Sequence, residues 1–172
     1  AVPVEHERSA LAFSEHILDR TASKGLVNLA LNPTGVGFPK LFTEYTNAGD
    51  NLKDLADGII SSKQGPPIDE GPRNRWTNYD RQETAFVEVQ FETEQDVHQV
   101  ELFAYNDFGG VPTPKAVSVQ YWDGSQWQEA ANQEVTVGTY ENDTWIVPFT
   151  INFDVFRTAN VRVTMIPQDG KS

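Results

Sequence analysis

The chain has 172 residues, no cysteine, and 25 acidic against 13 basic side chains, which gives a formal net charge of −12. Its length indicates one domain, and 38% hydrophobic residues are enough for a packed core. The lack of cysteine excludes disulfides, thiol catalysis and cysteine-ligated zinc, and the negative charge argues against a nucleic-acid partner. No apolar run is long enough for a membrane span, and the N-terminus shows no signal-peptide pattern.

The first 25 residues form a segment of their own, ahead of a β-domain that we place at 26–172. The stretch "LAFSEHILDRTASK" has partial helical spacing at Leu11, Ser14 and Leu18, so a short amphipathic helix is one interpretation and a linker is another. Residues 39–84 are rich in Gly, Pro, Asn and Asp and show little alternation, which is typical of long loops on a β-scaffold. One short helical turn is expected at "NLKDLADG", with Leu52 and Leu55 packed inward.

Strand patterns follow one another from residue 83 to residue 166. The segments 83–91, 97–105, 115–122, 144–153 and 160–166 alternate apolar and polar residues and are rich in β-branched and aromatic types. The Asp-Gly of "YWDGSQW" predicts a hairpin turn, and Pro148 predicts an edge position or a bulge. The pattern predicts an all-β antiparallel sandwich whose inward residues include Val87, Val89, Val100, Leu102, Val117, Val119, Phe149, Ile151, Val161 and Val163.

The sequence also resembles a known family. The run "NLKDLADGIISS" with the following "NRWTNY", then "AFVEVQF", "VHQVELFAYNDFGGVPTPKAVSVQYWDGSQW" and "FRTANVRVTM", is similar to galactose-binding-like domains. These comprise the discoidin family, the C-type domains of coagulation factors and bacterial carbohydrate-binding modules. The resemblance covers residues 27–166. It implies a jelly-roll sandwich and a non-catalytic module that holds a parent glycoside hydrolase on a plant or algal polysaccharide containing galactose or arabinose.

The end of the chain departs from that family pattern. In that family a last strand of alternating apolar residues that contains a glutamate follows the "VRV" strand, whereas this chain ends at "DGKS". Residues 9–18, "SALAFSEHIL", have the form of that strand and lie at the other end of the sequence. We therefore expect that the N-terminal segment supplies the displaced strand, as in a circular permutation. Termini of sandwich domains usually lie close together, so a circular permutation requires little change in the fold.

The resemblance implies a structural Ca²⁺ site beside the loop "LADG". Calcium takes oxygen ligands from carboxylates and backbone carbonyls. Asp57 matches the aspartate of the family motif, Asn74 stands where relatives have a threonine, and Glu15 takes the glutamate position if the permutation holds. The backbone carbonyl near Leu55 would add a ligand. The alternative is that Asp57 only caps a turn.

The ligand site implied by the resemblance lies on loops at one end of the sandwich. Sugars bind to flat apolar surfaces flanked by a few oriented polar groups. The loops offer Trp76, Asn78, Tyr79, Arg81, Asn106, Asp107 and Phe108. Trp76 could equally be a core residue beneath the loops, Asn106 and Asp107 could cap the "NDFGG" turn, and the hairpin residues Trp122 and Trp127 have a structural explanation.

The remaining expectations concern catalysis, partners and location. No catalytic motif or histidine spacing for a metal is present, so we expect no enzyme activity. The expected partners are a polysaccharide or oligosaccharide and a parent catalytic domain in cis, with no nucleic acid and no membrane. We expect a monomeric, secreted or cell-surface bacterial module. The alternative function is a structural spacer that contacts protein and binds no sugar.

Overall fold

The structure is a computed structural model of the chain that describes residues 25–60, 75–141 and 143–169. Among the described residues the regular secondary structure is β-strand apart from one 3-10 helix, and no helix is long and apolar enough to cross a membrane. Its elements are β1 (Lys40–Phe42), the 3-10 helix η1 (Leu52–Leu55), β2 (Ala85–Tyr105), β3 (Ala116–Trp122), β4 (Trp127–Glu129), β5 (Glu134–Val137) and β6 (Ile146–Ile166).

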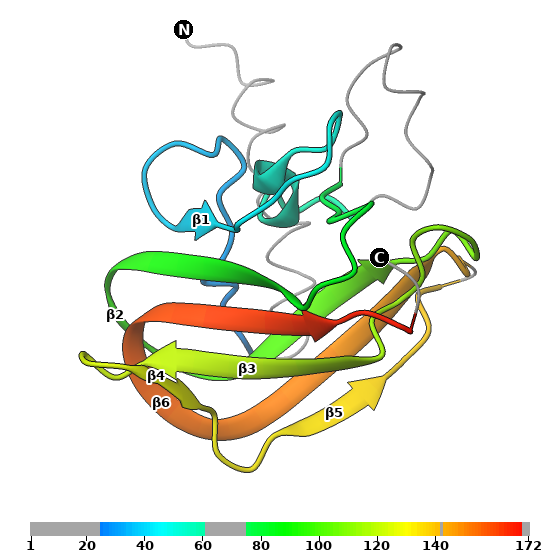
Figure 1. Cartoon of the computed structure of the whole chain (residues 1–172). Helices are drawn as coiled ribbons and strands as arrows, with labels where there is room; N and C mark the ends of the chain where they lie inside the picture. The colour runs from blue at the N-terminus through cyan, green and yellow to red at the C-terminus, as the bar shows by residue number, and fades with distance from the viewer. Residues whose placement is uncertain (1–24, 61–74, 142, 170–172) are drawn as a thin grey trace, which may run out of the picture.

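Two long strands, β2 and β6, run through both layers of the sandwich (Figure 1). In the first layer the early half of β2 pairs with β1 and with the late half of β6, which in turn pairs with β3, followed by β4. In the second layer the late half of β2 pairs with the early half of β6, which also pairs with β5. All of these pairings are antiparallel, so the predicted antiparallel sandwich is confirmed.

The predicted division into five strands from 83 to 166 needs one correction. Segments 83–91 and 97–105 form a single strand, and so do segments 144–153 and 160–166. The β2–β6 register slips twice, between Gln90 and Gln95 and between Val97 and Gln99. The residues at these bends include no Gly or Pro, so the chain bends through irregular pairing and does not leave the sheet in a turn.

The core lies between the two layers and uses the inward residues that the alternation predicts. Val119 and Ile151 are fully buried at its centre, one from each layer. Phe153 stacks on Phe156 at a centroid distance of 5.0 Å, and Phe156 stacks on Tyr121 at 4.4 Å. These rings fill the closed end of the sandwich, where β2 and β6 bend from one layer to the other (Figure 1).

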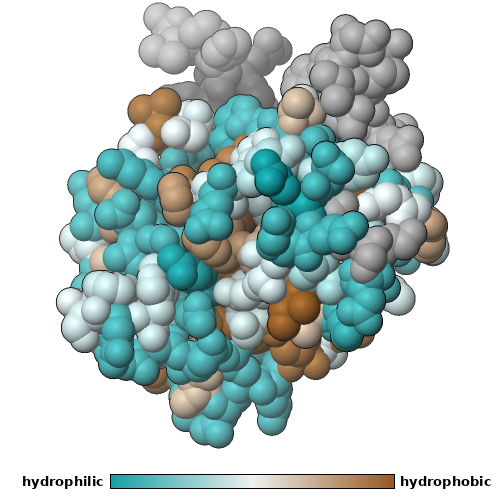
Figure 2. Space-filling view, viewed as in Figure 1, coloured by the Kyte–Doolittle hydropathy of each residue, from teal (hydrophilic) through white to brown (hydrophobic). Residues whose placement is uncertain are grey.

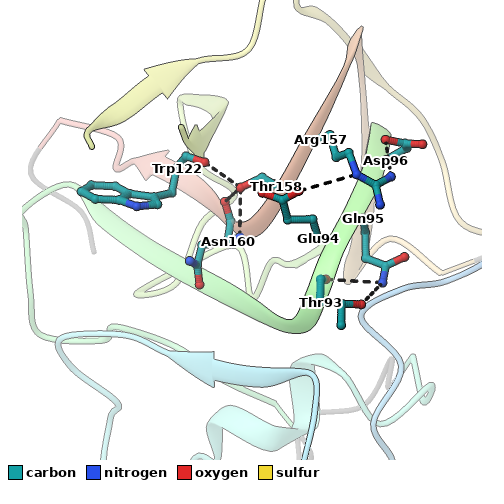
Figure 3. Close-up of polar contacts among 8 residues, drawn as sticks. All are labelled: Thr93, Glu94, Gln95, Asp96, Trp122, Arg157, Thr158 and Asn160. Atoms are coloured by element: carbon teal, nitrogen blue, oxygen red, sulfur yellow. Dashed lines mark hydrogen bonds and ion pairs between the residues drawn. The ribbon is translucent and has the colours of Figure 1, made fainter. Parts of the chain in front are cut away.

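A buried threonine holds the bend of β6. Thr158 is 2% exposed, and its hydroxyl donates to the Trp122 carbonyl at 2.8 Å and accepts from the Asn160 N–H at 3.1 Å (Figure 3). Outside the core, exposed Arg157 pairs with Glu94 at 3.6 Å and with Asp96 at 3.1 Å across the same bend. Because exposed ion pairs contribute little, the Thr158 contacts carry more of the stability at this corner.

Two predicted details differ from the structure. Pro148 lies inside β6 and pairs with Phe103 of β2 without a register slip, so the expected bulge is absent. On its other side the pairing with β5 stops at Phe149, so the expected edge position applies on that side only. The Pro148 carbonyl accepts a hydrogen bond from the Gly138 N–H, one residue past the end of β5. The N–H that a proline lacks would point to this same side, where the β5–β6 pairing has already ended. The short helical turn is confirmed as η1, but Leu55 is 39% exposed and Asp54 is the buried member.

The predicted displaced strand at residues 9–18 lies outside the described residues, as does the rest of the segment 1–24. Within the described part of the chain, the late half of β2 pairs with β6 on one side. The proposal that the N-terminal segment completes the sandwich therefore stays a prediction.

We predict that Thr158→Val lowers the free energy of unfolding by about 2 kcal/mol, because the isosteric change leaves a buried carbonyl and a buried N–H without their partner. Chemical denaturation measures the change. The control is Thr136→Val on the exposed strand β5, which should alter stability by less than about 0.5 kcal/mol. Equal effects of the two substitutions would contradict the role assigned to Thr158.

Candidate functional site

The loops at the open end of the sandwich are built on a buried carboxylate that the sequence analysis did not single out. The side chain of Asp50 is fully buried, and it accepts hydrogen bonds from the Thr77 hydroxyl at 2.5 Å and from Arg75 Nε at 3.4 Å. Asn51 N–H donates to the Arg75 carbonyl, and Asn47 N–H donates to the Thr77 carbonyl. These bonds join the loop before η1 to the segment 75–81, where several predicted ligand residues lie.

Arginine–aromatic contacts connect these hydrogen-bonded segments to neighbouring loops. The Arg75 guanidinium carbon lies 4.4 Å from the centroid of the Tyr105 ring, at the end of β2. The Arg81 guanidinium carbon lies 4.5 Å from the centroid of the Tyr45 ring. A guanidinium is weakly hydrated and interacts well with aromatic faces, so both contacts are favourable.

A group of aromatic side chains lies on the loops beyond this base. Trp145, just before β6, contacts Tyr105 at a centroid distance of 6.0 Å and Phe108 at 5.8 Å. A Cβ on Gly110 would come within 3.0 Å of the Tyr79 ring, so this ring packs directly against the loop after β2. Tyr79 is 46% exposed and Phe108 is 65% exposed. We call Tyr79, Tyr105, Phe108 and Trp145 the loop-end aromatic group.

The predicted ligand residues occupy different environments. Asn78 is half-buried, and its carbonyl accepts from the Arg81 N–H at 3.0 Å. The structure thus brings Tyr79 together with the loop of Phe108, whereas Arg81 contacts Tyr45 on another loop. The alternative of a structural Trp76 is supported, because its indole N–H lies 3.1 Å from both the Tyr45 carbonyl and the Thr46 hydroxyl oxygen.

Asn106 and Asp107 hold the loop on which Phe108 is displayed. The Asn106 side-chain oxygen accepts from the Phe108 N–H at 3.0 Å. One Asp107 carboxylate oxygen accepts from the N–H groups of Gly109 and Val111, at 2.8 and 2.9 Å. Phe108 itself adopts φ 59, a left-handed conformation that is uncommon for an aromatic residue. Backbone strain of this kind persists only where surrounding bonds fix it, and here these capping bonds do so.

Sequence reasoning missed Asp50, Arg75 and Trp145 as parts of this end of the molecule. Trp145 falls inside the predicted strand 144–153, which implies a regular strand position, whereas it precedes β6. Asp50 and Arg75 stand in loops without periodic pattern, so no local signal reveals that they meet. The hydroxyl of Tyr105 is buried without a hydrogen-bond partner among the described residues.

Of the predicted calcium ligands, Leu55 and Asp57 lie among the described residues, in the segment 54–57. Asp54 and Asp57 are both buried, and an Asp57 carboxylate oxygen accepts from the Ile59 N–H at 2.7 Å. Burial raises the pKa of Asp54 above its ordinary value; Lys53 opposes the rise, and the nearby Asp57 adds to it. Asn74 and Glu15 lie outside the described residues, and within the described part no three acidic or histidine side chains form a metal-binding cluster.

Asp54 and Asp57 fit part of an oxygen shell for a hard cation. Two buried carboxylates close in sequence repel one another, and a divalent ion would relieve that repulsion. Lys53 Nζ lies 3.7 Å from Asp54 and opposes the rise in its pKa more than Asp57 adds to it, so burial is the main cost of the Asp54 charge that an ion would relieve. The capping role considered for Asp57 is present, and a carboxylate that caps a turn keeps a second oxygen for another ligand.

Comparison with known proteins finds no matching family model and no matching curated protein. A solved chain of the Streptococcus pneumoniae β-galactosidase BgaA is similar in structure, with a TM-score of 0.68 at 21% identity, covering 84% of this chain and 92% of that chain. Chitosan-binding module 2 of a Paenibacillus sp. IK-5 chitosanase/glucanase, solved with chitotriose, has a TM-score of 0.45 at 18% identity and covers 81% of this chain and 88% of its own.

The module CpGH89CBM32-5 of Clostridium perfringens, solved with GalNAc-β-1,3-galactose, has a TM-score of 0.43 at 9% identity, with coverages of 76% and 86%. The likeness to the BgaA chain is the one that carries weight, and at its level of identity it shows a shared fold. The β-sandwich fold expected from the sequence resemblance is therefore confirmed.

We predict that Asp50→Ala lowers the free energy of unfolding by on the order of 3 kcal/mol, because it leaves Arg75 and Thr77 without a buried partner. Chemical denaturation monitored by tryptophan fluorescence measures it. Arg157→Ala is the matched control, since both of its ion pairs are exposed and should contribute less than about 1 kcal/mol. A loss for Asp50→Ala no larger than for the control would show that Asp50 does not hold the loops.

Proposed function

We propose that this protein is a non-catalytic carbohydrate-binding module whose sugar site is the loop-end aromatic group. The observation that carries the proposal is the exposure of Tyr79 and Phe108, with half-buried Trp145 against Phe108. Asp50 holds the loop of Tyr79, and Asp107 holds the loop of Phe108. Exposed rings held rigidly are suited to the C–H faces of a sugar, because they need little ordering on binding. The polar groups nearest to them in sequence, Asn78 and Asp107, are suited to hydroxyls.

Sugar binding by so few groups is weak at a single site. A dissociation constant of roughly 10⁻³–10⁻⁵ M is expected, since each hydroxyl gives up good hydration in water. Such a module is useful when it is joined to a catalytic domain, because the tether raises the local concentration of polysaccharide around the enzyme. We therefore infer a parent glycoside hydrolase in cis, and a secreted or cell-surface location in a bacterium.

The preferred sugar in this proposal contains galactose or arabinose. Support comes from the sequence resemblance and from the fold shared with a chain of a β-galactosidase. The net charge of −12 favours a neutral polysaccharide over an acidic one, because a negatively charged polymer would be repelled by the negatively charged protein. This support concerns the class of ligand and leaves the linkage to experiment.

We also propose a structural calcium ion at Asp54 and Asp57. Its support is the pair of buried carboxylates described above, of which Asp54 was not among the residues predicted from sequence. The ion would join the 54–57 segment to further oxygen donors, with Leu55 contributing its carbonyl. Its function would be to fix loops, with no part in chemistry.

A spacer that contacts protein is the second candidate function, and one observation favours it. Apolar side chains around β1 and the neighbouring loops are exposed, among them Val27, Val36, Phe42 and Ile59. Exposed apolar side chains are typical of surfaces that pack against another domain. The two functions are compatible, because these residues are not members of the loop-end aromatic group.

We predict that Tyr79→Ala and Phe108→Ala each weaken binding to galactan or arabinan about tenfold, the equivalent of about 1.4 kcal/mol. Affinity electrophoresis in gels containing each polysaccharide measures the effect, after a glycan array has ranked the ligands. Arg81→Ala should weaken binding less, because its guanidinium is already stacked on Tyr45. The control is Val155→Ala, an exposed apolar residue on β6. Unchanged retardation of both aromatic variants would remove this site.

We predict that calcium at 100 times its dissociation constant stabilises the wild type by about 2.7 kcal/mol relative to chelator, and that Asp54→Asn and Asp57→Asn lose most of this gain. Thermal unfolding with calcium and with EDTA measures it. The Asp57→Asn change keeps a side-chain oxygen for the Ile59 N–H, so the turn remains. In EDTA, Asp54→Asn should be as stable as the wild type or more so, because it removes a buried charge. Identical melting curves of the wild type in both buffers would exclude the ion.

A further inference from the structure

The outer face of the first layer carries aromatic rings arranged around an arginine. Since Val87, Val119 and Val163 point into the core, their neighbours in β2, β3 and β6 point outward. On this outward face the Arg162 guanidinium carbon lies 4.0 Å from the centroid of Phe86 and 4.0 Å from that of Trp127. We call Phe42, Phe86, Arg162, Trp127 and Trp122 the Arg162 platform.

The platform extends across most of the layer. Phe42 of β1, which is 55% exposed, contacts Phe86 at a centroid distance of 6.1 Å, and Trp127 contacts Trp122 at 5.7 Å. The rings and the guanidinium together make contacts from one edge of the layer to the other. This layer faces the viewer in Figure 1, and in the same view Figure 2 shows hydrophobic surface interspersed with a larger hydrophilic area.

The charge of Arg162 is compensated within the face. Glu88 lies directly opposite Arg162 in the β2–β6 register, and its carboxylate is 3.4 Å from the arginine NH2 group. About a fifth of each side chain is exposed, so this pair is better shielded from solvent than the pairs of Lys115 and Arg157. Arg162 Nε is buried and has no hydrogen-bond partner among the described residues. The guanidinium therefore acts mainly as a flat, neutralised extension of the rings.

The β3–β4 hairpin fixes the two tryptophans. An Asp123 carboxylate oxygen accepts from the N–H groups of Ser125 and Gln126, at 2.8 and 2.9 Å, and the other oxygen accepts from the Gln128 amide at 2.7 Å. The bond from Gln128, followed by those of the turn, holds the pKa of Asp123 well below its ordinary value. The turn therefore keeps its geometry at neutral pH, and the indoles need little ordering to bind a ligand.

Two side-chain amides that are available for hydrogen bonding lie beside these rings. Gln90 and Asn160 are opposite each other in the β2–β6 register, and Asn160 is next to Trp122 across β6 and β3. Neither side-chain amide has a hydrogen-bond partner in the part of the chain that is described. Figure 3 shows the Trp122 indole and the Asn160 amide extending from neighbouring strands beside the Thr158 contacts. Each amide offers two donors and an acceptor to a ligand.

We propose that the Arg162 platform with Gln90 and Asn160 is a second carbohydrate-binding surface, for a neutral sugar chain lying across the first layer. Ring faces bordered by free amides match the two sides of a sugar, its C–H face and its hydroxyls. The Glu88 pair compensates Arg162, and the overall charge of −12 disfavours an anionic ligand, although exposed Lys40, opposite Gln90 in the β1–β2 register, adds a positive charge to this face. The choice of sugar as ligand rests on the proposed function, but the surface shares no residue with the loop-end aromatic group.

The four tryptophans of the chain provide the test. Trp76 and Trp145 lie at the loop end, and Trp122 and Trp127 lie in the platform. Galacto-oligosaccharides and arabino-oligosaccharides would be titrated into the full ¹⁵N-labelled chain. The final concentration of about 10 mM is higher than the dissociation constants expected. The indole N–H signals report each surface separately. We expect the Trp122 and Trp127 signals to shift, whether or not the Trp145 signal does.

The double substitution Gln90→Ala with Asn160→Ala should reduce the affinity measured from the Trp122 and Trp127 shifts about tenfold, the loss of two neutral hydrogen bonds. Trp122→Phe, which keeps a ring in the hairpin, should also weaken it. The matched control is Gln99→Ala, an amide on the outer face of the second layer. Each variant is first checked for an unchanged melting temperature.

The outcomes separate the two proposals. Shifts confined to Trp145 and Trp76, or platform shifts unaffected by the double substitution, overturn the second surface and leave the loop-end site in place. Shifts confined to Trp122 and Trp127 support the second surface and remove the loop-end site. No indole shift with either oligosaccharide overturns both.

Discussion

Both β2 and β6 pass from one layer of the sandwich to the other, and this continuity sets the positions of the core and of the loops. Because each strand belongs to both layers, a register slip in one layer would misplace every side chain of the other. The irregular pairing at the bend absorbs the change of direction, and Thr158 satisfies the carbonyl of Trp122 that would otherwise be buried alone. Stacked Phe153, Phe156 and Tyr121 then fill the closed end.

The same continuity determines where loops can carry function. At the open end, β2 finishes at Tyr105 and β6 begins at Ile146, which are directly opposite each other in the register. The connections that leave these two positions are therefore held together at their base by the sheet. Tyr105 and Trp145 meet there, and Arg75 joins them from a loop anchored on buried Asp50. A rigid base with exposed rings above it is the arrangement that a weak, low-contact ligand requires.

Arginine is used in a consistent way in this acidic chain. Arg75, Arg81 and Arg162 each lie against aromatic rings, and Arg75 and Arg162 are also paired with a carboxylate. Their charges are thus compensated locally while their planar groups enlarge apolar surface, so the field of the molecule remains negative. This is unfavourable for polyanions and compatible with neutral polymers. It connects the composition of the chain with the class of ligand proposed for both of its surfaces.

The antiparallel sandwich, the inward residues of its strands, the Asp123-Gly124 hairpin and the short turn at 52–55 could all be predicted from the amino-acid sequence, because they depend on local periodicity and turn chemistry. The sequence also brought the segments 76–81 and 105–108 to one end, through a family resemblance. Tertiary structure decided the continuity of β2 and β6, the burial of Asp54 in place of Leu55, and the meeting of Asp50 with Arg75 and of Phe86 with Arg162 and Trp127. Those contacts join residues far apart in the chain, and no local pattern encodes which distant side chain will fill the space beside another.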